Sequence, residues 1–259
     1  MQLFGDLNVY YYPNKKDNPY KIVMHKKRFN ADEINYENNN SESSFIDNDT
    51  KLKNNISRAK TKIRDYAYCN DWEYFVTFTF SDTNIDRYDL KEIKKRMSTF
   101  FNNYKKRHNN EFKYLLIPEF HKDGAVHFHG LVSGINKNHL HLFKLSEKLP
   151  QYIYSQIRKG IEIYDFKEFS KRFGYTVVEK IRNEQAAANY ITKYITKDLV
   201  SLPLGTCCYL NSKGLKLPEL IHQDYGGIIP QNVKMYENEY ICILWVKNID
   251  EYLSIMLGA

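Results

Sequence analysis

The sequence predicts an α+β fold in which helices cover a central antiparallel sheet. Three observations indicate this fold. A strand-like segment precedes an amphipathic helix, an Asp-Gly step joins two further strand-like segments, and a later strand is followed by a helix containing three consecutive alanines. The chain has 259 residues, which is enough to bury a sizeable core.

Composition restricts the class of partner. Hydrophobic residues make up 42% of the chain and aromatic residues 15%, and the formal net charge is +7. Lysine and arginine bind phosphates and aromatic rings stack on bases, so a nucleic acid is one expected partner. A basic surface over a tyrosine-rich core would give the same composition. The four cysteines form no CxxC pair, and we expect reduced thiols.

The sequence offers no sign of a membrane segment or leader. The N-terminus lacks a basic stretch followed by a long apolar one, so we expect no signal peptide. The longest apolar run, at 241–246, is too short to span a bilayer. These features favour a cytoplasmic protein with no membrane partner.

We expect three parts along the chain. Residues 1–70 form an N-terminal segment with a polar, Asn-rich linker at 29–56, where apolar anchors are few, and a short basic helix at 57–68. Residues 71–200 form the main domain. Residues 201–259 are expected to add strands that pack on that same domain.

The main domain begins with a strand and a helix. Residues 72–80 alternate and are rich in β-branched and aromatic side chains, which is typical of a strand. Residues 86–109 place apolar side chains at helical spacing, and Asp86 or Asp89 can serve the first turn.

A hairpin follows, with strands expected at 112–120 and 126–132. If Asp123-Gly124 alone form the loop, Phe120 lies opposite His127; if Lys122 joins the loop and Gly124 is left-handed, Glu119 lies opposite His127. We favour the second register, because the first would leave the Glu119 carboxylate on the buried face.

The hairpin carries two histidines on one face. Residues two apart in a strand point the same way, so His127 and His129 lie side by side while Phe128 packs into the core. With Glu119 they can hold a divalent ion that leaves positions open for phosphate and water. Mg²⁺ or Mn²⁺ suits phosphate chemistry, and Zn²⁺ or Ni²⁺ can also bind such a set. Two surface histidines without a metal are the alternative.

The second half of the domain is expected to hold helices within 139–159, a strand at 174–181 and a helix at 183–200. His139 and His141 are also two apart, but their segment looks helical, where such residues diverge by about 200°. Asn183 can cap the last helix, and Pro203 follows it.

The last helix has tyrosines and lysines on one face. Tyr190, Lys193, Tyr194 and Lys197 are spaced i, i+3, i+4 and i+7. The two phenols are about 6 Å apart along the axis. A phenol has a pKa near 10 in water, and a nearby ammonium or a metal-polarised phosphodiester makes it a better nucleophile. An amphipathic helix with half-buried tyrosines is the alternative.

The strand "FVTFTF", the His-Phe-His segment and the Tyr-x-x-Lys-Tyr-x-x-Lys helix occur in this order. The set resembles the three motifs of the HUH endonucleases, the rolling-circle replication initiators of phages and plasmids. Its two tyrosines resemble the branch that includes initiators of small single-stranded DNA phages. The resemblance covers about residues 72–218, including "NSKGLKLP" at 211–218, and the Asn-rich segment before Trp72 has no counterpart.

The resemblance implies a role for each matching residue. Glu119, His127 and His129 match the metal ligands, and Tyr190 and Tyr194 match the paired nucleophiles. Lys193 and Lys197 match the lysines that follow these tyrosines. The implied fold is a ferredoxin-like sheet related to RNA-recognition domains.

The implied reaction takes place on single-stranded or melted origin DNA in a bacterial host cell. A tyrosine forms a 5′-phosphotyrosine link and leaves a free 3′-OH for the host polymerase, and a host helicase is an expected partner. No GxxxxGK[ST] loop is present, so we expect no attached helicase domain. The second tyrosine can release a unit-length circle.

Three other functions fit the same motifs. A transposase or relaxase would use the same chemistry. A non-catalytic module could bind single-stranded nucleic acid on the sheet. A metal-dependent hydrolase would leave a free 5′-phosphate without a covalent adduct.

Overall fold

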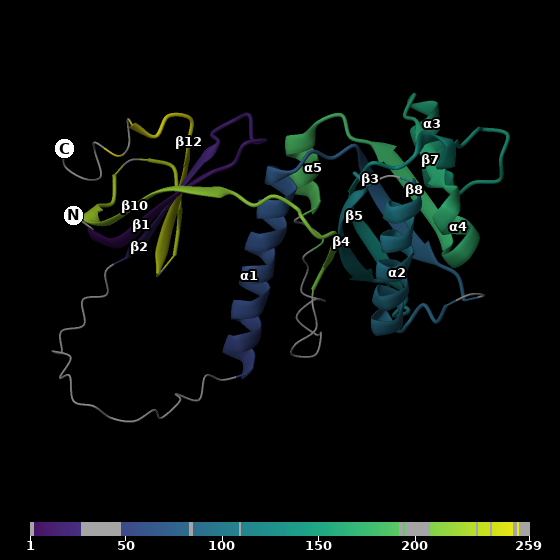
Figure 1. The fold of residues 1–259 in the computed structure, drawn as a ribbon, viewed down its shortest axis with the longest axis horizontal. Coiled ribbons are helices and arrows are strands. Elements are labelled where there is room, and N and C mark those ends of the chain that lie inside the picture. Colours follow the sequence, from purple (N-terminus) through teal and green to yellow (C-terminus); the bar gives the residue numbers. More distant parts are fainter. Residues whose placement is uncertain are drawn as a thin grey trace. The chain divides into compact units, whose positions relative to one another are not determined.

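The chain folds into two compact units, Asn48–Lys216 and a second one made of Met1–Asp47 with Leu217–Ala259. This division replaces the boundaries expected near residues 70 and 200. The computed structural model (Figure 1) describes residues 3–26, 48–82, 85–108, 110–191, 194, 208–231, 233–238, 240–250 and 253.

Seven strands form one antiparallel sheet in the larger unit, in the order β6-β7-β8-β3-β5-β4-β9. Their bounds are β3 (Tyr74–Phe80), β4 (Lys113–Phe120), β5 (Val126–Ser133), β6 (Leu140–Leu142), β7 (Ile163–Phe166), β8 (Gly174–Lys180) and β9 (Leu210–Asn211). The expected α+β fold is confirmed, and the four strands expected from the sequence are the neighbours β8, β3, β5 and β4.

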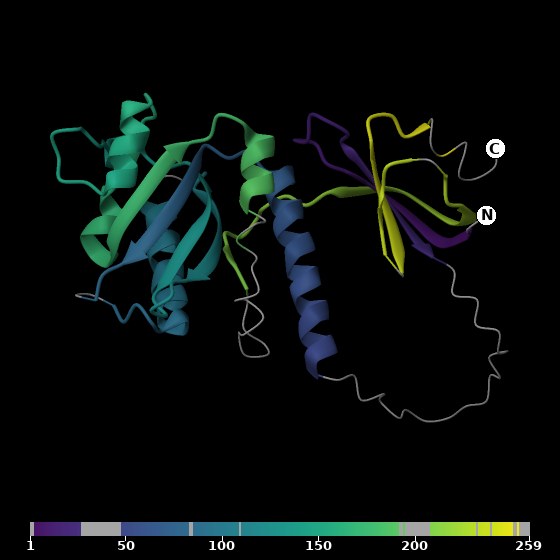
Figure 2. The same ribbon diagram turned by 180° about the vertical axis from the view of Figure 1, so that it is seen from behind.

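Helices cover this sheet. They are α1 (Asn48–Cys69), α2 (Leu90–His108), α3 (Gln151–Arg158), α4 (Lys167–Phe173) and α5 (Glu184–Ile191). Figure 1 shows α2 in front of the sheet, and Figure 2, from behind, shows the strands in front of α2. The carboxylate of Asp89 accepts the Glu92 N–H at 2.9 Å, so Asp89 caps α2.

The two faces of the sheet differ because strand side chains alternate. Phe78 on β3 is fully buried, and its ring centroid lies 4.3 Å from that of Phe169 on α4 and 5.7 Å from that of Phe101 on α2. The intervening residues Thr77 and Thr79 are only partly buried and point to the opposite face. The α2–α4 face therefore holds the core, and the other face is open to a site.

Two expected segments differ from the sequence prediction. Residues 48–56, expected in a linker, lie in α1, and the rest of that linker, 27–47, lies outside the described residues. The segment with His139 and His141 is a 3₁₀ turn (Lys137–His139) followed by β6, and a helix begins only at Gln151. His139 contacts Tyr104 and His141 contacts Glu147, so the two side chains of this pair have different partners.

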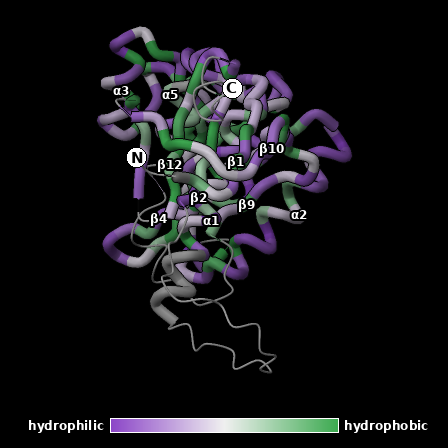
Figure 3. Tube along the Cα trace, turned by 90° about the vertical axis from the view of Figure 1, so that its left-hand side faces the viewer, coloured by the Kyte–Doolittle hydropathy of each residue, from purple (hydrophilic) through white to green (hydrophobic). Residues whose placement is uncertain are grey.

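The smaller unit is a five-stranded sheet in the order β10-β1-β2-β12-β11. Its strands are β1 (Leu3–Tyr11), β2 (Tyr20–Lys26), β10 (Glu219–Ile228), β11 (Tyr236–Glu237) and β12 (Ile241–Val246). Hydrophobic stretches of β2 and β12 appear green in Figure 3, and Met24 and Leu244 are among the buried residues of its core.

The expected position of the C-terminal part is wrong. It was expected to pack on the main domain, but β10 pairs with β1 and β12 pairs with β2. These pairings join the two ends of the chain, and no local pattern announces them. Among the described helices, none is long and apolar enough to cross a bilayer.

Candidate active site

The β4–β5 hairpin has the register favoured by the sequence. Glu119 lies opposite His127, and the His121 N–H donates to the Ala125 carbonyl at 2.9 Å, which leaves a three-residue loop. Gly124 has a φ of +87°, a conformation that favours glycine. This register places the carboxylate and both imidazoles on the open face of the sheet.

A close approach of the strands also depends on Gly130. A Cβ at this position would lie 2.2 Å from the Leu115 carbonyl oxygen, so any other residue would push β4 away from β5. The glycine follows His129 directly. It therefore keeps the histidine strand against the strand that carries Glu119.

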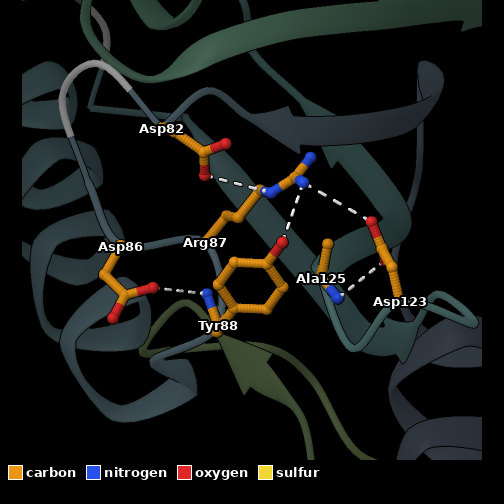
Figure 4. Close-up of polar contacts among 6 residues, drawn as sticks. All are labelled: Asp82, Asp86, Arg87, Tyr88, Asp123 and Ala125. Carbon is orange, nitrogen blue, oxygen red and sulfur yellow. Dashed lines mark hydrogen bonds and ion pairs between the residues drawn. The ribbon is translucent and has the colours of Figure 1, made fainter.

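Arg87 ties the hairpin tip to the loop between β3 and α2. Figure 4 shows its guanidinium between Asp82, at 3.0 Å, and Asp123 of the hairpin, at 3.5 Å. The Arg87 carbonyl also accepts the Val126 N–H at 2.9 Å. A hydrogen bond from the Ala125 N–H lowers the pKa of Asp123, and the charge of Arg87 adds to this effect. The tip is therefore held by charged as well as backbone contacts.

Two threonines orient the two histidines. Thr77 and Thr79 on β3 lie opposite His129 and His127, and each hydroxyl lies 3.0 Å from the Nδ1 of its partner. The Nδ1 side of both rings is thus occupied, and Nε2 is the nitrogen left to face a ligand. A hydroxyl can donate or accept, so the same contact suits either imidazole tautomer. The Thr-x-Thr spacing in "FVTFTF" was the signal for these residues, and sequence analysis missed it.

Glu119 contacts His129 directly, with its Oε2 2.7 Å from Nε2. The ring of His121 stacks on that of His127, with centroids 4.1 Å apart. Burial, reinforced by the charges of His121 and His129, lowers the pKa of His127 to about 4. Burial also lowers the pKa of His129, although Glu119 opposes this. Both imidazoles are therefore neutral near pH 7, the form that binds a metal.

The donor chemistry fits a divalent cation. Two neutral imidazoles and one carboxylate converge on one face, and Mn²⁺ and Mg²⁺ accept such ligands. Within the part of the chain that the structure describes, no three His, Cys, Asp or Glu side chains form a finished metal-binding group. The Glu119–His129 hydrogen bond explains this, because a shared cation would have to replace the proton between the two atoms.

Helix α5 brings the tyrosines to this face. The Asn183 side chain accepts the Ala186 N–H at 2.9 Å and caps the helix as expected. Ala188 and Ile191 are buried, and Asn189 accepts a hydrogen bond from Tyr68 of α1. The helix is therefore anchored on one side while Tyr190, 44% exposed, stays accessible on the other.

The tyrosines lie against the histidines. The ring of Tyr194 stacks on His129 with centroids 4.1 Å apart and planes 14° apart. Its hydroxyl donates to the Tyr190 hydroxyl at 2.9 Å. Phe75 on β3 contacts both phenol rings, at 5.2 Å for Tyr190 and 6.1 Å for Tyr194. The surfaces predicted separately from sequence thus meet, whereas Lys193 and Lys197 lie outside the described residues.

The surroundings keep Tyr194 protonated. Burial raises the pKa of its phenol, and the hydrogen bond with Tyr190 and the charge of Glu119 raise it further. A positive charge placed beside Glu119 would oppose the last of these effects. The phenol and the carboxylate are therefore electrostatically linked.

A cavity of about 450 Å³ opens beside Tyr190. Phe75, Ala187 and Tyr190 give it an apolar side, and Lys180 and Arg182 give it two positive charges. Apolar walls with a few cations suit a base attached to a sugar and phosphate.

Comparison with known families agrees with this geometry. Residues 73–199 match the family model for replication-associated proteins of the ORF2 type. The matched segment lies within the larger unit and contains every residue predicted for the site. The match supports a replication initiator family and a role in DNA replication. Neither the curated proteins nor the solved structures give a match to the chain.

We expect the two threonines to affect metal binding. Changing Thr77 and Thr79 to valine keeps their shape but removes both contacts to Nδ1, and loss of such outer contacts typically costs about 10- to 100-fold in metal affinity. Titration calorimetry with Mn²⁺ measures this. Thr99→Val on α2, on the other face of the sheet, is the control. Equal Mn²⁺ affinity in the double variant and the parent chain would contradict the assigned orientation.

Proposed function

We propose that the protein is a replication initiator endonuclease that nicks single-stranded origin DNA through a tyrosine. One observation carries the proposal: Tyr194 stacks on His129 while Glu119 contacts the same imidazole. A nucleophile and a candidate metal-ligand set are thereby within one side chain of each other. The match to a replication-associated family supports the choice of DNA as substrate.

The proposed reaction is a phosphoryl transfer. The phenol oxygen of Tyr190 or Tyr194 forms a bond to phosphorus, and the bond from phosphorus to the 3′ oxygen breaks. The phenol loses its proton, and the departing oxygen gains one and becomes a free 3′-OH. The protein ends up joined to the 5′ phosphate. One phosphoester replaces another, so attack by a 3′-OH can reverse the step without ATP.

Glu119, His127 and His129 are the residues that would hold a Mg²⁺ or Mn²⁺ ion. Such an ion supplies charge neutralisation and polarisation of the scissile phosphate. Thr77 and Thr79 hold the imidazoles in place from behind. Phe75 fixes the phenols relative to these rings, so the nucleophile does not have to search for its position.

Two features favour a single strand as the substrate. The cavity beside Tyr190 has room and charge for one unstacked nucleotide, and a paired base could not enter it. The second tyrosine lies within hydrogen-bonding distance of the first, which suits two successive transfers at one site. After one round of synthesis, the second phenol can attack the regenerated junction and release a circle.

A cleavage assay tests the proposal. Labelled single-stranded origin DNA incubated with the full chain and Mn²⁺ should give a protein–DNA adduct that survives denaturation, and EDTA should prevent it. Cleavage that leaves a free 5′-phosphate without an adduct would indicate a hydrolase. Binding without any cleavage in Mn²⁺ or Mg²⁺ would indicate a non-catalytic module.

A further inference from the structure

A second groove lies on the other side of the sheet, between α2 and α4. Its volume is about 440 Å³, and four cations line it: Lys95, Arg96, Lys171 and Arg172. Of the described residues that line the groove, none carries a carboxylate. The groove thus combines a concave shape with charge of one sign.

The two arginines are held in place by a reciprocal contact. Arg96 of α2 lies over the ring of Phe173 on α4, with its Cζ 5.5 Å from the centroid. Arg172 of α4 lies over the ring of Phe100 on α2, at 5.3 Å. Both rings are at most 5% exposed, so each guanidinium rests on a fixed surface. Little side-chain freedom remains to be lost when an anion binds.

The two lysines are the mobile partners in this arrangement. Lys95 and Lys171 are exposed, and Lys171 lies 3.9 Å from Glu168 in a surface ion pair that a phosphate can replace at small cost. Thr99 and Asn103 add uncharged polar groups to the lining. Two fixed forks and two flexible ammonium groups suit a row of phosphates better than one small anion.

The groove offers no ring for base stacking among its described lining residues. Phe100 and Phe173 are buried, and their exposed edges are covered by the arginines. A protein that binds single strands uses open aromatic faces, whereas a protein that binds duplex backbone needs only cations. Duplex DNA also carries the higher charge density, about one phosphate per 1.7 Å of axis.

We infer that this groove binds the phosphate backbone of duplex DNA, at a position separate from the scissile strand. Phe78 points to the α2–α4 face and Thr77 to the tyrosine face, so the sheet itself separates the groove from the nicking site. The inference rests on the proposed function only in taking DNA as the ligand. Such a contact would hold the duplex that flanks a melted origin.

Fluorescence anisotropy with the full chain tests the inference. The probe is a labelled duplex of about 20 base pairs, titrated in EDTA at several salt concentrations, so the result does not depend on cleavage. Changing Lys95 and Lys171 to glutamine should weaken duplex binding by about tenfold and reduce the log–log salt slope by about 2. Both side chains are exposed, so thermal unfolding should match the parent chain.

The control removes the same charge elsewhere. Lys106 in the last turn of α2 and Lys159 after α3 are exposed and lie outside the groove, and changing both to glutamine should leave the duplex affinity within about twofold of the parent. Equal losses in the two double variants would overturn the inference, because net charge alone would then explain binding. An equal loss for oligo(dT) of the same length would overturn the assignment to duplex DNA.

Discussion

Changing Tyr190 and Tyr194 together to phenylalanine is expected to abolish the covalent adduct, a loss of at least about a thousandfold in the rate of its formation. Only the two hydroxyls are removed. The rings keep their contacts with Phe75 and His129, so the fold and single-stranded DNA binding should change little. A gel-based adduct assay with a binding measurement on the same preparation separates chemistry from affinity.

The single variants divide the work between the two phenols. The Tyr194 hydroxyl donates to that of Tyr190, so each variant removes one nucleophile and also that hydrogen bond. One variant should still form the first adduct but fail to transfer it to a second strand. Tyr152→Phe on α3 removes an exposed phenol remote from the site and serves as the control. A persistent adduct in the double variant would sink the assignment of the nucleophile.

Glu119→Gln is expected to produce the second-largest effect. The amide keeps the shape of the side chain but removes the charged ligand, so Mn²⁺ affinity and nicking at a fixed Mn²⁺ concentration should each fall by at least about 100-fold. Raising the Mn²⁺ concentration should restore part of the nicking rate. Calorimetry and nicking rates measured on one preparation check both expectations.

A purely electrostatic role for Glu119 predicts the opposite sign. Its charge helps to raise the pKa of Tyr194, so removing that charge should make the phenol more acidic. If this were its main effect, Glu119→Gln would increase the nicking rate. Glu92→Gln on α2 is the matched control, because it removes one carboxylate from the other face of the sheet. A faster Glu119→Gln enzyme would contradict a ligand role.

Local signals were sufficient to predict the hairpin and its neighbours. The loop with Gly124 decided the register that places Glu119 opposite His127, and the cap at Asn183 marked the start of α5. These features depend on residues close together in the sequence. The strand periodicity of residues 72–80 likewise fixed which of its side chains face the core.

Long-range pairing could not be predicted in the same way. β1 and β10 lie at opposite ends of the chain, and their hydrogen bonds leave no trace in either segment alone. Thr77 and Thr79 acquired meaning only when β3 was known to lie beside β5. Helix α1 was shortened in the prediction because its first turns are rich in polar residues, while buried positions such as Ile56 and Ile63 hold its face.

The most direct test of the central claim is to identify the residue joined to DNA. Single-stranded origin DNA is incubated with the full chain and Mn²⁺, the adduct is digested with nuclease and protease, and the peptides are analysed by mass spectrometry. We predict a nucleotide 5′-phosphate on Tyr190 or Tyr194 and no modified peptide in EDTA. A modified tyrosine elsewhere, or cleaved DNA with unmodified peptides, would contradict the account.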